Sequence, residues 1–300
     1  MNAIETFGLT KYYGPHRAID DLTISVARGE VFGFLGPNGA GKSTTIRSLM
    51  GLQRSTRGLA RILGLDTWQQ KVQVHRLVGY LPGELSLFDR MTGRQHVEWF
   101  LRARGIERPP DLPDLLERFE VVLDRPVRQL SKGNRQKLGI VLAVMHKPEV
   151  LILDEPSSGL DPLMQDTFHH LLRELALEGR TVFLSSHELD EVQRVADRVA
   201  IIKEGHLVVT DSVENLRAHA PQTIRVSFNA PIDPAVFKTI AGVSRATVDG
   251  NSVTLELDGA VGPLLRAVAE LDPVDLTARK ADLDELFLKY YRTEDTADAS

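Results

Sequence analysis

The sequence predicts an α/β protein built on a parallel β-sheet, followed by a small α+β domain. Up to about residue 210, apolar strand-like runs alternate with helical segments, which is typical of a parallel sheet. A glycine-rich loop at residues 36–43 joins one of these strands to a helix. Beyond residue 222 the predicted order becomes β-α-β-β-α-β, which is typical of a split βαβ motif.

The composition is that of a chain large enough for two folded domains. The 300 residues are 42% hydrophobic and 26% charged, which excludes a disordered chain. No apolar run approaches the ~20 residues that a bilayer crossing needs. Because Glu5 lies near the N-terminus and no apolar stretch follows it, we expect no signal peptide. The chain has no cysteine, which excludes disulfides and thiolate sites, and its net charge of −5 argues against nucleic acid as a partner.

Short strands and one buried strand are predicted at the start of the chain. Residues 5–10 and 22–27 alternate roughly between polar and apolar side chains, as half-buried strands do. The run VFGFLG at 31–36 is continuous, as in a strand that is buried on both faces. A helix is expected from about Lys42 to Met50, with Gly51 as its C-terminal stop.

The middle of the chain is predicted to be helical and then to return to buried strands. Thr92 and Gln95 have the spacing of a capping box ahead of an apolar helical stripe. Residues 114–123 repeat that stripe, and Ser131 could cap a third helix. Three apolar strands, separated by helices, are expected at 150–154, 181–186 and 198–203.

The pattern changes after Thr210 and divides the chain into domains. We expect residues 1–211 to form the first domain and residues 212–222 to form a short helix and linker. Residues 223–300 are expected to form a small α+β domain of ferredoxin-like order, with a last helix at 283–291.

The glycine-rich loop matches the phosphate-binding pattern G-x-x-x-x-G-K-[ST] in full. Its glycines allow successive backbone N–H groups to turn toward an anion, and the helix N-terminus adds partial positive charge. Lys42 can reach the β- and γ-phosphates of ATP, and the Ser43 hydroxyl can bind Mg²⁺. A chance glycine-rich turn is the weaker alternative. The residues expected to contact nucleotide are Gly36, Pro37, Asn38, Gly39, Ala40, Gly41, Lys42, Ser43 and Thr44.

Two acidic residues, Asp154 and Glu155, stand at the end of the apolar strand 150–154. Their side chains should point in opposite directions, because side chains alternate along a strand. In a chain with a phosphate loop, Asp154 is expected to hold Mg²⁺, either as a direct ligand or through contacts with the groups that bind the ion. Glu155 is expected to orient or deprotonate the water that attacks the γ-phosphate. A helix cap or a solvated carboxylate is the alternative role for such a residue.

Five motifs in order resemble those of the ATP-binding cassette (ABC) ATPases over roughly residues 1–210. Besides the phosphate loop and the carboxylate strand, they are Leu130–Gln136, Ser158–Asp161 and His187. The resemblance implies a P-loop NTPase fold with a RecA-like parallel sheet core, an antiparallel β subdomain and a helical subdomain. It also implies ATP hydrolysis with Mg²⁺.

The resemblance implies further roles, residue by residue. The signature loop, which in the family meets the γ-phosphate bound by the opposite protomer, would be Ser131, Lys132 and Gly133. Asp161 would lie at the dimer seam, and His187 would be the switch histidine near the γ-phosphate. Tyr13 falls where the family keeps an aromatic residue that stacks on adenine, with Tyr12 as the competing choice. A helix cap at Ser131 and a surface histidine at 187 are the alternatives.

The sequence departs from the family pattern at two places. Lys132 and Asn134 replace a glycine and a glutamine of the signature, although Lys132 can still donate to phosphate or ribose. The family usually places a glutamine that contacts Mg²⁺ and water just after a turn like the one at 79–82, where this chain has Gly83. Either Glu84 substitutes for the glutamine, or the link between nucleotide and transmembrane partner is weaker in this chain; our hypothesis is that Glu84 approaches Mg²⁺ through water.

The finer resemblance is to exporter ATPases of the multidrug and daunorubicin-resistance kind, which also end in a Leu-Asp-Glu-Leu-Phe-like helix, here at 283–287. It implies a head-to-tail homodimer that closes on ATP and powers the export of a drug-like or lipophilic compound. The partners would be polytopic permease subunits, docked near residues 88–104, at the cytoplasmic face of the cell membrane. The alternatives are a soluble ABC ATPase and a nucleotide-sensing module, neither coupled to transport.

Overall fold

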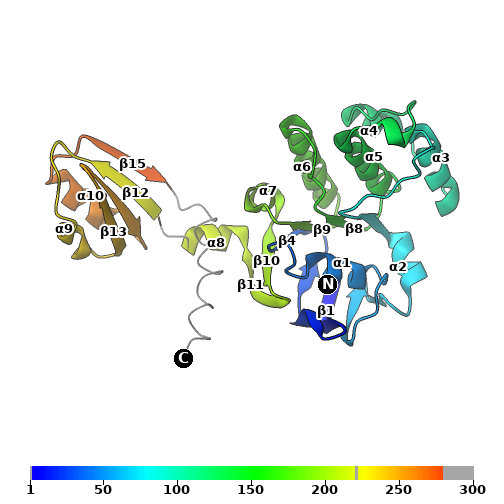
Figure 1. Ribbon diagram of the computed structural model, residues 1–300, viewed down its shortest axis with the longest axis horizontal. Helices are drawn as coiled ribbons and strands as arrows, with labels where there is room; N and C mark the ends of the chain where they lie inside the picture. The colour runs from blue at the N-terminus through cyan, green and yellow to red at the C-terminus, as the bar shows by residue number, and fades with distance from the viewer. Residues whose placement is uncertain (1, 220–221, 280–300) are drawn as a thin grey trace. The chain divides into compact units, whose positions relative to one another are not determined.

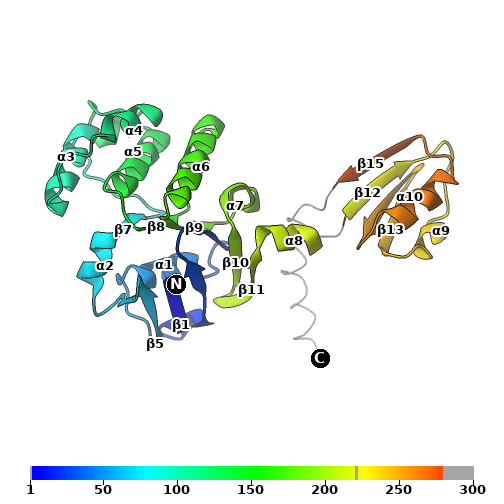
Figure 2. The same ribbon diagram turned by 180° about the vertical axis from the view of Figure 1, so that it is seen from behind.

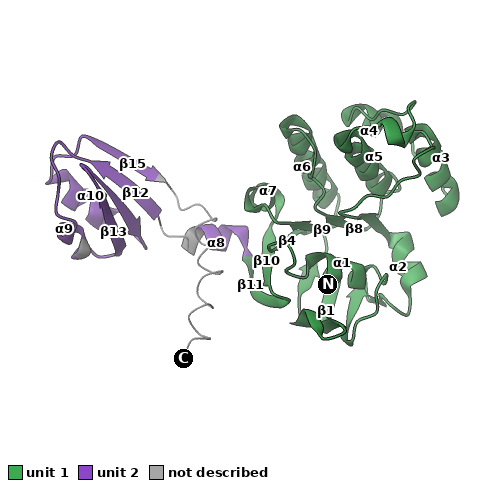
Figure 3. Ribbon diagram, in the orientation of Figure 1, with its two compact units in different colours: residues 1–211 green, residues 212–300 purple. Residues whose placement is uncertain are grey.

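The computed structural model describes residues 2–219 and 222–279 of the chain. Two compact units are present, Met1–Asp211 and Ser212–Ser300 (Figure 3). The first contains all the residues that the sequence predicts for nucleotide binding.

A six-stranded sheet in the order β11-β10-β4-β9-β8-β7 forms the centre of the first unit (Figure 1). Its strands are β4 (Val31–Leu35), β7 (Val78–Leu81), β8 (Val150–Asp154), β9 (Thr181–Ser186), β10 (Arg198–Lys203) and β11 (His206–Ser212). The pairs from β10 to β7 are parallel, and β4, β8 and β9 are buried throughout. This confirms the strands predicted at 31–36, 150–154, 181–186 and 198–203. The turn expected at 79–82 is wrong. Residues 79–81 belong to strand β7, because they pair with the buried strand β8.

An antiparallel sheet in the order β2-β1-β5-β6, with β3 also paired to β1, completes the β structure of this unit. Its strands are β1 (Asn2–Tyr13), β2 (His16–Leu22), β3 (Ser25–Ala27), β5 (Arg57–Ile62) and β6 (Leu65–Asp66). The single strand expected at 22–27 is wrong. Leu22 pairs with Leu9 while Ser25 pairs with Glu5, so the chain breaks its extended run between the two pairings.

The helices of the first unit cover both faces of the parallel sheet, with α1 on the side opposite α5 and α6 (Figures 1 and 2). They are α1 (Lys42–Leu49), α2 (Lys71–Leu77), α3 (Gly93–Arg104), α4 (Leu112–Arg118), α5 (Lys132–Val144), α6 (Pro162–Leu177) and α7 (Leu189–Val195), with a 3₁₀ turn at Val127–Gln129. The capping box at Thr92 and Gln95 is confirmed. The helix expected at 114–123 is too long, because the chain leaves it after Arg118 and turns through Glu120 at a φ of 48°.

The second unit opens with α8 (Val213–His219), so much of the segment 212–222 is helical. Its sheet has the order β13-β14-β12-β15, with antiparallel pairs, around a core that includes Phe237 and Leu255. The elements are β12 (Gln222–Ser227), α9 (Ala235–Lys238), β13 (Val243–Asp249), β14 (Ser252–Leu257), α10 (Gly262–Ala269) and β15 (Asp275–Arg279). Their order is the predicted β-α-β-β-α-β. The helix predicted at 283–291 lies outside the described residues.

No helix in residues 2–219 or 222–279 is both long and apolar enough to cross a bilayer.

Candidate nucleotide-binding and catalytic site

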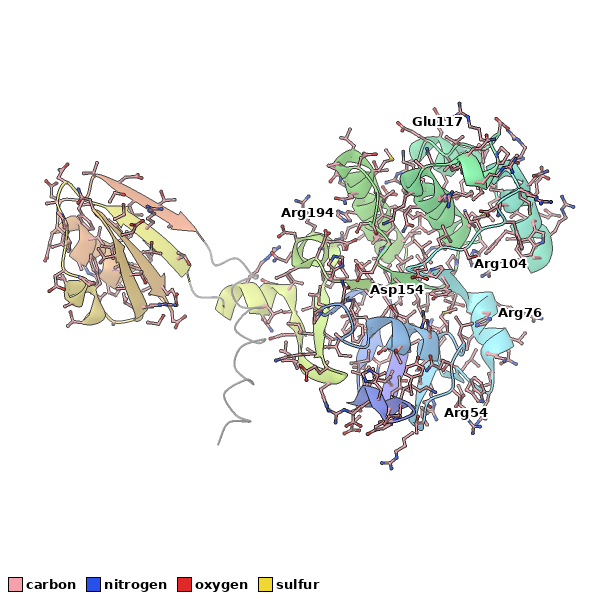
Figure 4. All side chains as sticks on the ribbon, viewed as in Figure 1. Arg54, Arg76, Arg104, Glu117, Asp154 and Arg194 are labelled. Atoms are coloured by element: carbon pink, nitrogen blue, oxygen red, sulfur yellow. The ribbon has the colours of Figure 1, made fainter. Side chains whose placement is uncertain are left out.

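The ends of three neighbouring parallel strands form the candidate site. β4 runs into the phosphate loop, β8 ends at Asp154, and β9, which lies between them in the sheet, ends at Ser186. Parallel strands place their carboxyl ends on one edge of a sheet, and ligands bind in the crevice outside that edge. Figure 4 shows Asp154 near the centre of the first unit.

The phosphate loop requires glycine at two positions for steric reasons. A Cβ atom on Gly36 would lie 2.5 Å from the carbonyl oxygen of Ile202, and one on Gly41 would lie 2.5 Å from that of Ala18. Gly41 also has a φ of 108°, which favours glycine, and it caps the N-terminus of α1. The loop tip at 37–39 is exposed, whereas Ala40 is buried. The loop therefore packs its base on the core and leaves its tip open to a ligand.

The ammonium group of Lys42 points back toward the start of its own loop, and the side chain is only 6% exposed. Its Nζ atom donates to the carbonyl oxygens of Gly36, at 2.6 Å, and Pro37, at 3.2 Å. It also lies 3.3 Å from Oε1 of Glu155, across the edge of the sheet. Ser43 and Thr44 follow in the first turn of α1 and are half-buried.

Asp154 is buried, and its contacts show which atoms remain for a ligand. Its Oδ1 accepts a hydrogen bond of 2.6 Å from the Ser185 hydroxyl. A Cβ atom on Gly83 would lie 3.3 Å from Oδ2, so the position that replaces the family glutamine lies directly beside this carboxylate. Together with burial, the charge of Asp154 raises the pKa of Tyr80 to about 12. Oδ2 is therefore the oxygen that faces the region of residue 83.

Glu155 leaves the strand in an unusual backbone conformation, with a φ of 50°. A non-glycine residue in the left-handed region carries strain of about 1–3 kcal/mol, which is often found at functional sites. Its N–H donates to the carbonyl oxygen of Ser185 at 3.1 Å, which holds it at the strand end. Its Oε2 lies 2.6 Å from Nδ1 of His187. The carboxylate is thus held between the imidazole and the ammonium group of Lys42.

The signature residues lie against the loop at 157–161 of their own chain. Ser131 caps α5, accepting a hydrogen bond of 3.2 Å from the N–H of Asn134. The ammonium group of Lys132 donates to the Ser158 hydroxyl at 2.9 Å. A Cβ atom on Gly133 would lie 2.7 Å from the carbonyl oxygen of Gly159.

Asp161 begins α6, where its Oδ1 accepts a hydrogen bond of 3.0 Å from the N–H of Met164. Within the described residues, no hydrogen bond or ion pair joins residues 131–133 to the phosphate loop or to His187. The structure therefore brings the signature and Asp161 together, but not to the phosphate loop of the same chain.

The remaining predicted residues are exposed. The Tyr13 hydroxyl donates to Oε1 of Gln53 at 2.6 Å, and the ring lies 5.4 Å from Nζ of Lys11. Tyr12 is also exposed, and its backbone N–H donates to Thr56. Glu84 is exposed and, among the described residues, makes no hydrogen bond or ion pair.

Sequence reasoning missed three side chains that shape the site. Ser185 binds Asp154, and its hydroxyl lies 3.3 Å from the N–H of Glu155. Gln136 is buried and donates to the carbonyl oxygen of Pro156 at 2.7 Å, which ties α5 to the chain after Glu155. Glu191 is a buried acid on α7. Ser185 could have been found from the sequence, because two serines end the apolar run 181–186. Glu191 gave no such signal, because an acid on a short helix usually faces solvent.

Comparisons with known proteins agree with this geometry. The family model described as ABC transporter matches residues 19–158. A bacitracin transport ATP-binding protein of Bacillus licheniformis is 37% identical over 217 residues, 71% of each chain. A daunorubicin/doxorubicin resistance ATP-binding protein of Streptomyces peucetius is 33% identical over 302 residues, 95% of this chain and 91% of that one. The solved structure of an ATP-binding subunit of an ABC transporter, 31% identical, superposes with a TM-score of 0.67 over 72% of this chain and 92% of its own.

Proposed function

Since this chain belongs to the ABC transporter family as an ATP-binding and ATP-hydrolysing subunit, we propose that it powers a membrane exporter of a drug-like or lipophilic compound. The observation that carries the ATP-hydrolysing part of this proposal is the position of the Glu155 carboxylate at the strand ends. It lies 2.6 Å from His187 and 3.3 Å from Lys42. One relative is named for the transport of bacitracin and another for resistance to daunorubicin and doxorubicin, and both names support this class of cargo.

We assign the triphosphate of ATP to the phosphate loop. Lys42 would exchange its bonds to the carbonyl oxygens of Gly36 and Pro37 for bonds to phosphate oxygens, where the acceptor carries the opposite charge. The first turn of α1 adds backbone N–H groups and the partial positive charge of the helix N-terminus. Tyr13 is exposed, and we assign it to adenine stacking.

The oxygen atoms of Ser43 and Asp154 fit Mg²⁺. Asp154 uses Oδ1 to bind Ser185 and leaves Oδ2 for another partner. Mg²⁺ usually relies on one or two protein ligands plus substrate phosphates, and Ser43 and Asp154 would supply the protein ligands here. When bound, the ion would neutralise charge on the β- and γ-phosphates. We assign Glu84 to an approach through water.

Glu155 would orient the attacking water and accept its proton. A carboxylate can act as general base when it lies within hydrogen-bond reach of the water. His187 fixes one oxygen of Glu155, while Lys42 approaches the other. Binding of the triphosphate would draw Lys42 toward phosphate and free that oxygen for water.

We place the second half of the nucleotide site on another copy of the chain. In the part of the chain that the structure describes, residues 131–133 make no hydrogen bond to their own phosphate loop, and they contact Ser158 and Gly159, which lead to Asp161. A head-to-tail dimer would place each signature loop opposite the partner's γ-phosphate.

The permease surface is assigned to the exposed aromatic pair of Phe88 and Trp99, whose rings meet edge to face at 5.5 Å. Buried His96 anchors this pair, because its Nε2 accepts a hydrogen bond of 3.0 Å from the N–H of Phe88. Exposed aromatic pairs are typical of interaction sites. We place the chain at the cytoplasmic face of the membrane through this contact.

We assign residues 1–211 to nucleotide binding, 212–222 to a linker and 223–300 to an accessory domain. The alignment with the daunorubicin/doxorubicin resistance protein includes this last part, because it covers 95% of the chain.

Co-purification from solubilised membranes tests the transport role. The tagged chain should retain a polytopic permease, and Trp99→Ala should lose it while still binding ATP. Trp68→Ala, on another exposed tryptophan, is the matched control and should retain the permease. Recovery of the tagged chain without any polytopic partner would support a soluble ATPase instead.

A further inference from the structure

A buried acid lies beside the catalytic pair without a hydrogen bond of its own. Glu191 belongs to α7, is 5% exposed, and neither of its carboxyl oxygens has a hydrogen-bond partner among the described residues. An ionised carboxylate in such a place costs several kcal/mol unless it is paired. Acidic side chains usually lie at the surface, where water solvates them. Glu191 is buried, so its place in the core requires a different explanation.

Two hydroxyls face this acid from the two segments that carry catalysis. Ser186 immediately precedes His187, and its Oγ already accepts a hydrogen bond of 3.0 Å from the N–H of Glu188. Ser157 lies in the turn that begins at Glu155, and both serines are buried. Both hydroxyls lie close enough to the Glu191 carboxyl to lower its pKa, although neither makes a hydrogen bond of ordinary geometry with it. Glu191 therefore lies where a bridge between the two segments would form.

The charges around Glu191 favour its neutral form. Helix α7 packs against α6, β4 and β9, and neither strand carries a titratable side chain. Burial is the main cause that raises the pKa of Glu191, to about 7; the Ser186 and Ser157 hydroxyls lower it, and the charges of Glu155 and Glu188 raise it further. On α6, burial lowers the pKa of His169, and the charge of Arg194 lowers it further.

We propose that Glu191 is a positioning residue whose buried carboxyl group links Ser157 to Ser186 and so fixes Glu155 relative to His187. A neutral carboxyl can donate to one hydroxyl and accept from the other, whereas a carboxylate only accepts. Loss of the proton would also place a second negative charge beside Glu155. The contact to be maintained is the 2.6 Å bond between Glu155 and His187.

This inference rests on the proposed ATPase function, so the test must separate the two. We would measure kcat and KM for ATP from pH 6 to 9 in the full chain, assembled with its permease. The variants are Glu191→Gln, which keeps a neutral hydrogen-bonding group, and Glu191→Leu, which removes it. Asp190→Asn, on the exposed side of α7, is the matched control.

The wild type should lose kcat as pH rises through about 7, while Glu191→Gln should keep wild-type kcat at pH 6 and lose that decline. Glu191→Leu should lower kcat about tenfold with little change in KM, since small displacements of reacting groups are costly to rate. If the leucine variant does not fold, the pH profile of Glu191→Gln decides.

The inference is overturned if Glu191→Gln keeps the wild-type decline, if it loses as much kcat as the leucine variant, or if Glu191→Leu turns over like the wild type. A wild-type chain that does not hydrolyse ATP would contradict the proposed function itself.

Discussion

The ammonium nitrogen of Lys42 lies 3.3 Å from a carboxylate oxygen of Glu155, and this pair joins the phosphate loop to the end of β8. We proposed Lys42 as a ligand of the triphosphate and Glu155 as the residue that orients the attacking water. The same ammonium cannot serve a carboxylate and a triphosphate equally, so nucleotide binding should change the surroundings of Glu155. On this proposal the pair would couple the binding of ATP to its hydrolysis.

Lys42→Ala should abolish useful ATP binding, because the loop loses its charged donor and Glu155 loses the cation that screens it from phosphate. A charged hydrogen bond contributes about 1.5–3 kcal/mol, so affinity should fall by roughly tenfold to a hundredfold. Calorimetry with ATP measures this directly. Lys71→Ala, at an exposed lysine, is the control. Unchanged affinity in Lys42→Ala would exclude the phosphate-loop assignment.

Glu155→Gln should bind ATP, hydrolyse it at least about tenfold more slowly and accumulate as a dimer with MgATP, because the amide keeps the shape of the acid but accepts no proton. Turnover assays and light scattering after gel filtration measure both effects. Glu149→Gln, at an exposed acid just before β8, should behave as the wild type. Wild-type turnover in Glu155→Gln would mean that another group activates water.

Gly133→Ala should lower both thermal stability and ATPase rate, since its methyl group would lie 2.7 Å from the carbonyl oxygen of Gly159. Overpacking of this kind costs about 1–3 kcal/mol. Gly262→Ala makes the same chemical change where the nearest atom is 3.9 Å away, and it should be tolerated. Equal melting temperatures and rates for the two variants would show that the signature loop moves aside freely.

Glu84→Ala should raise the Mg²⁺ concentration needed for half-maximal ATPase rate by about tenfold, as loss of groups around a metal commonly does. A magnesium titration of the ATPase rate tests this, with exposed Glu107→Ala as the control. An unchanged Mg²⁺ dependence would remove Glu84 from the site and leave Gly83 without a substitute for the family glutamine.

The stability of the first unit should depend on the proton of Glu191. Its pKa rises to about 7 in the folded chain, above the ordinary 4.5, so the folded state holds a proton that the unfolded chain releases. Stability from this group is complete below pH 4.5 and is lost as pH rises to about 7. Unfolding of the wild type and of Glu191→Gln across that range should differ in slope. Parallel curves would show that the group does not titrate there.

The strands that position the site could be predicted because their apolar runs are continuous, as at 150–154 and 181–186. Helix α2 gave no such signal, since Val74 is its buried residue and its other side chains are exposed or half-buried. The helix predicted at 114–123 was too long because the apolar pattern continues beyond its true end. The chain turns at Glu120, although apolar residues follow it.

Side-chain partners within the site were harder to predict than the motifs. Strand alternation does not apply to Glu155, because the residue leaves β8 in a left-handed conformation in which its N–H donates to the carbonyl oxygen of Ser185. Lys132 was expected to donate to phosphate or ribose, and its partner in the structure is Ser158 of the same chain. Such contacts depend on loops that are distant in sequence, which periodicity does not report.

The central claim is that each triphosphate is bound by residues 36–44 of one copy and by residues 131–133 of the other. The structure of Glu155→Gln in its closed dimer with MgATP tests this claim most directly. We expect the Ser131 hydroxyl within hydrogen-bonding distance of the γ-phosphate held by Lys42 of the opposite copy. A closed dimer in which Ser131 lies far from either γ-phosphate would contradict the account.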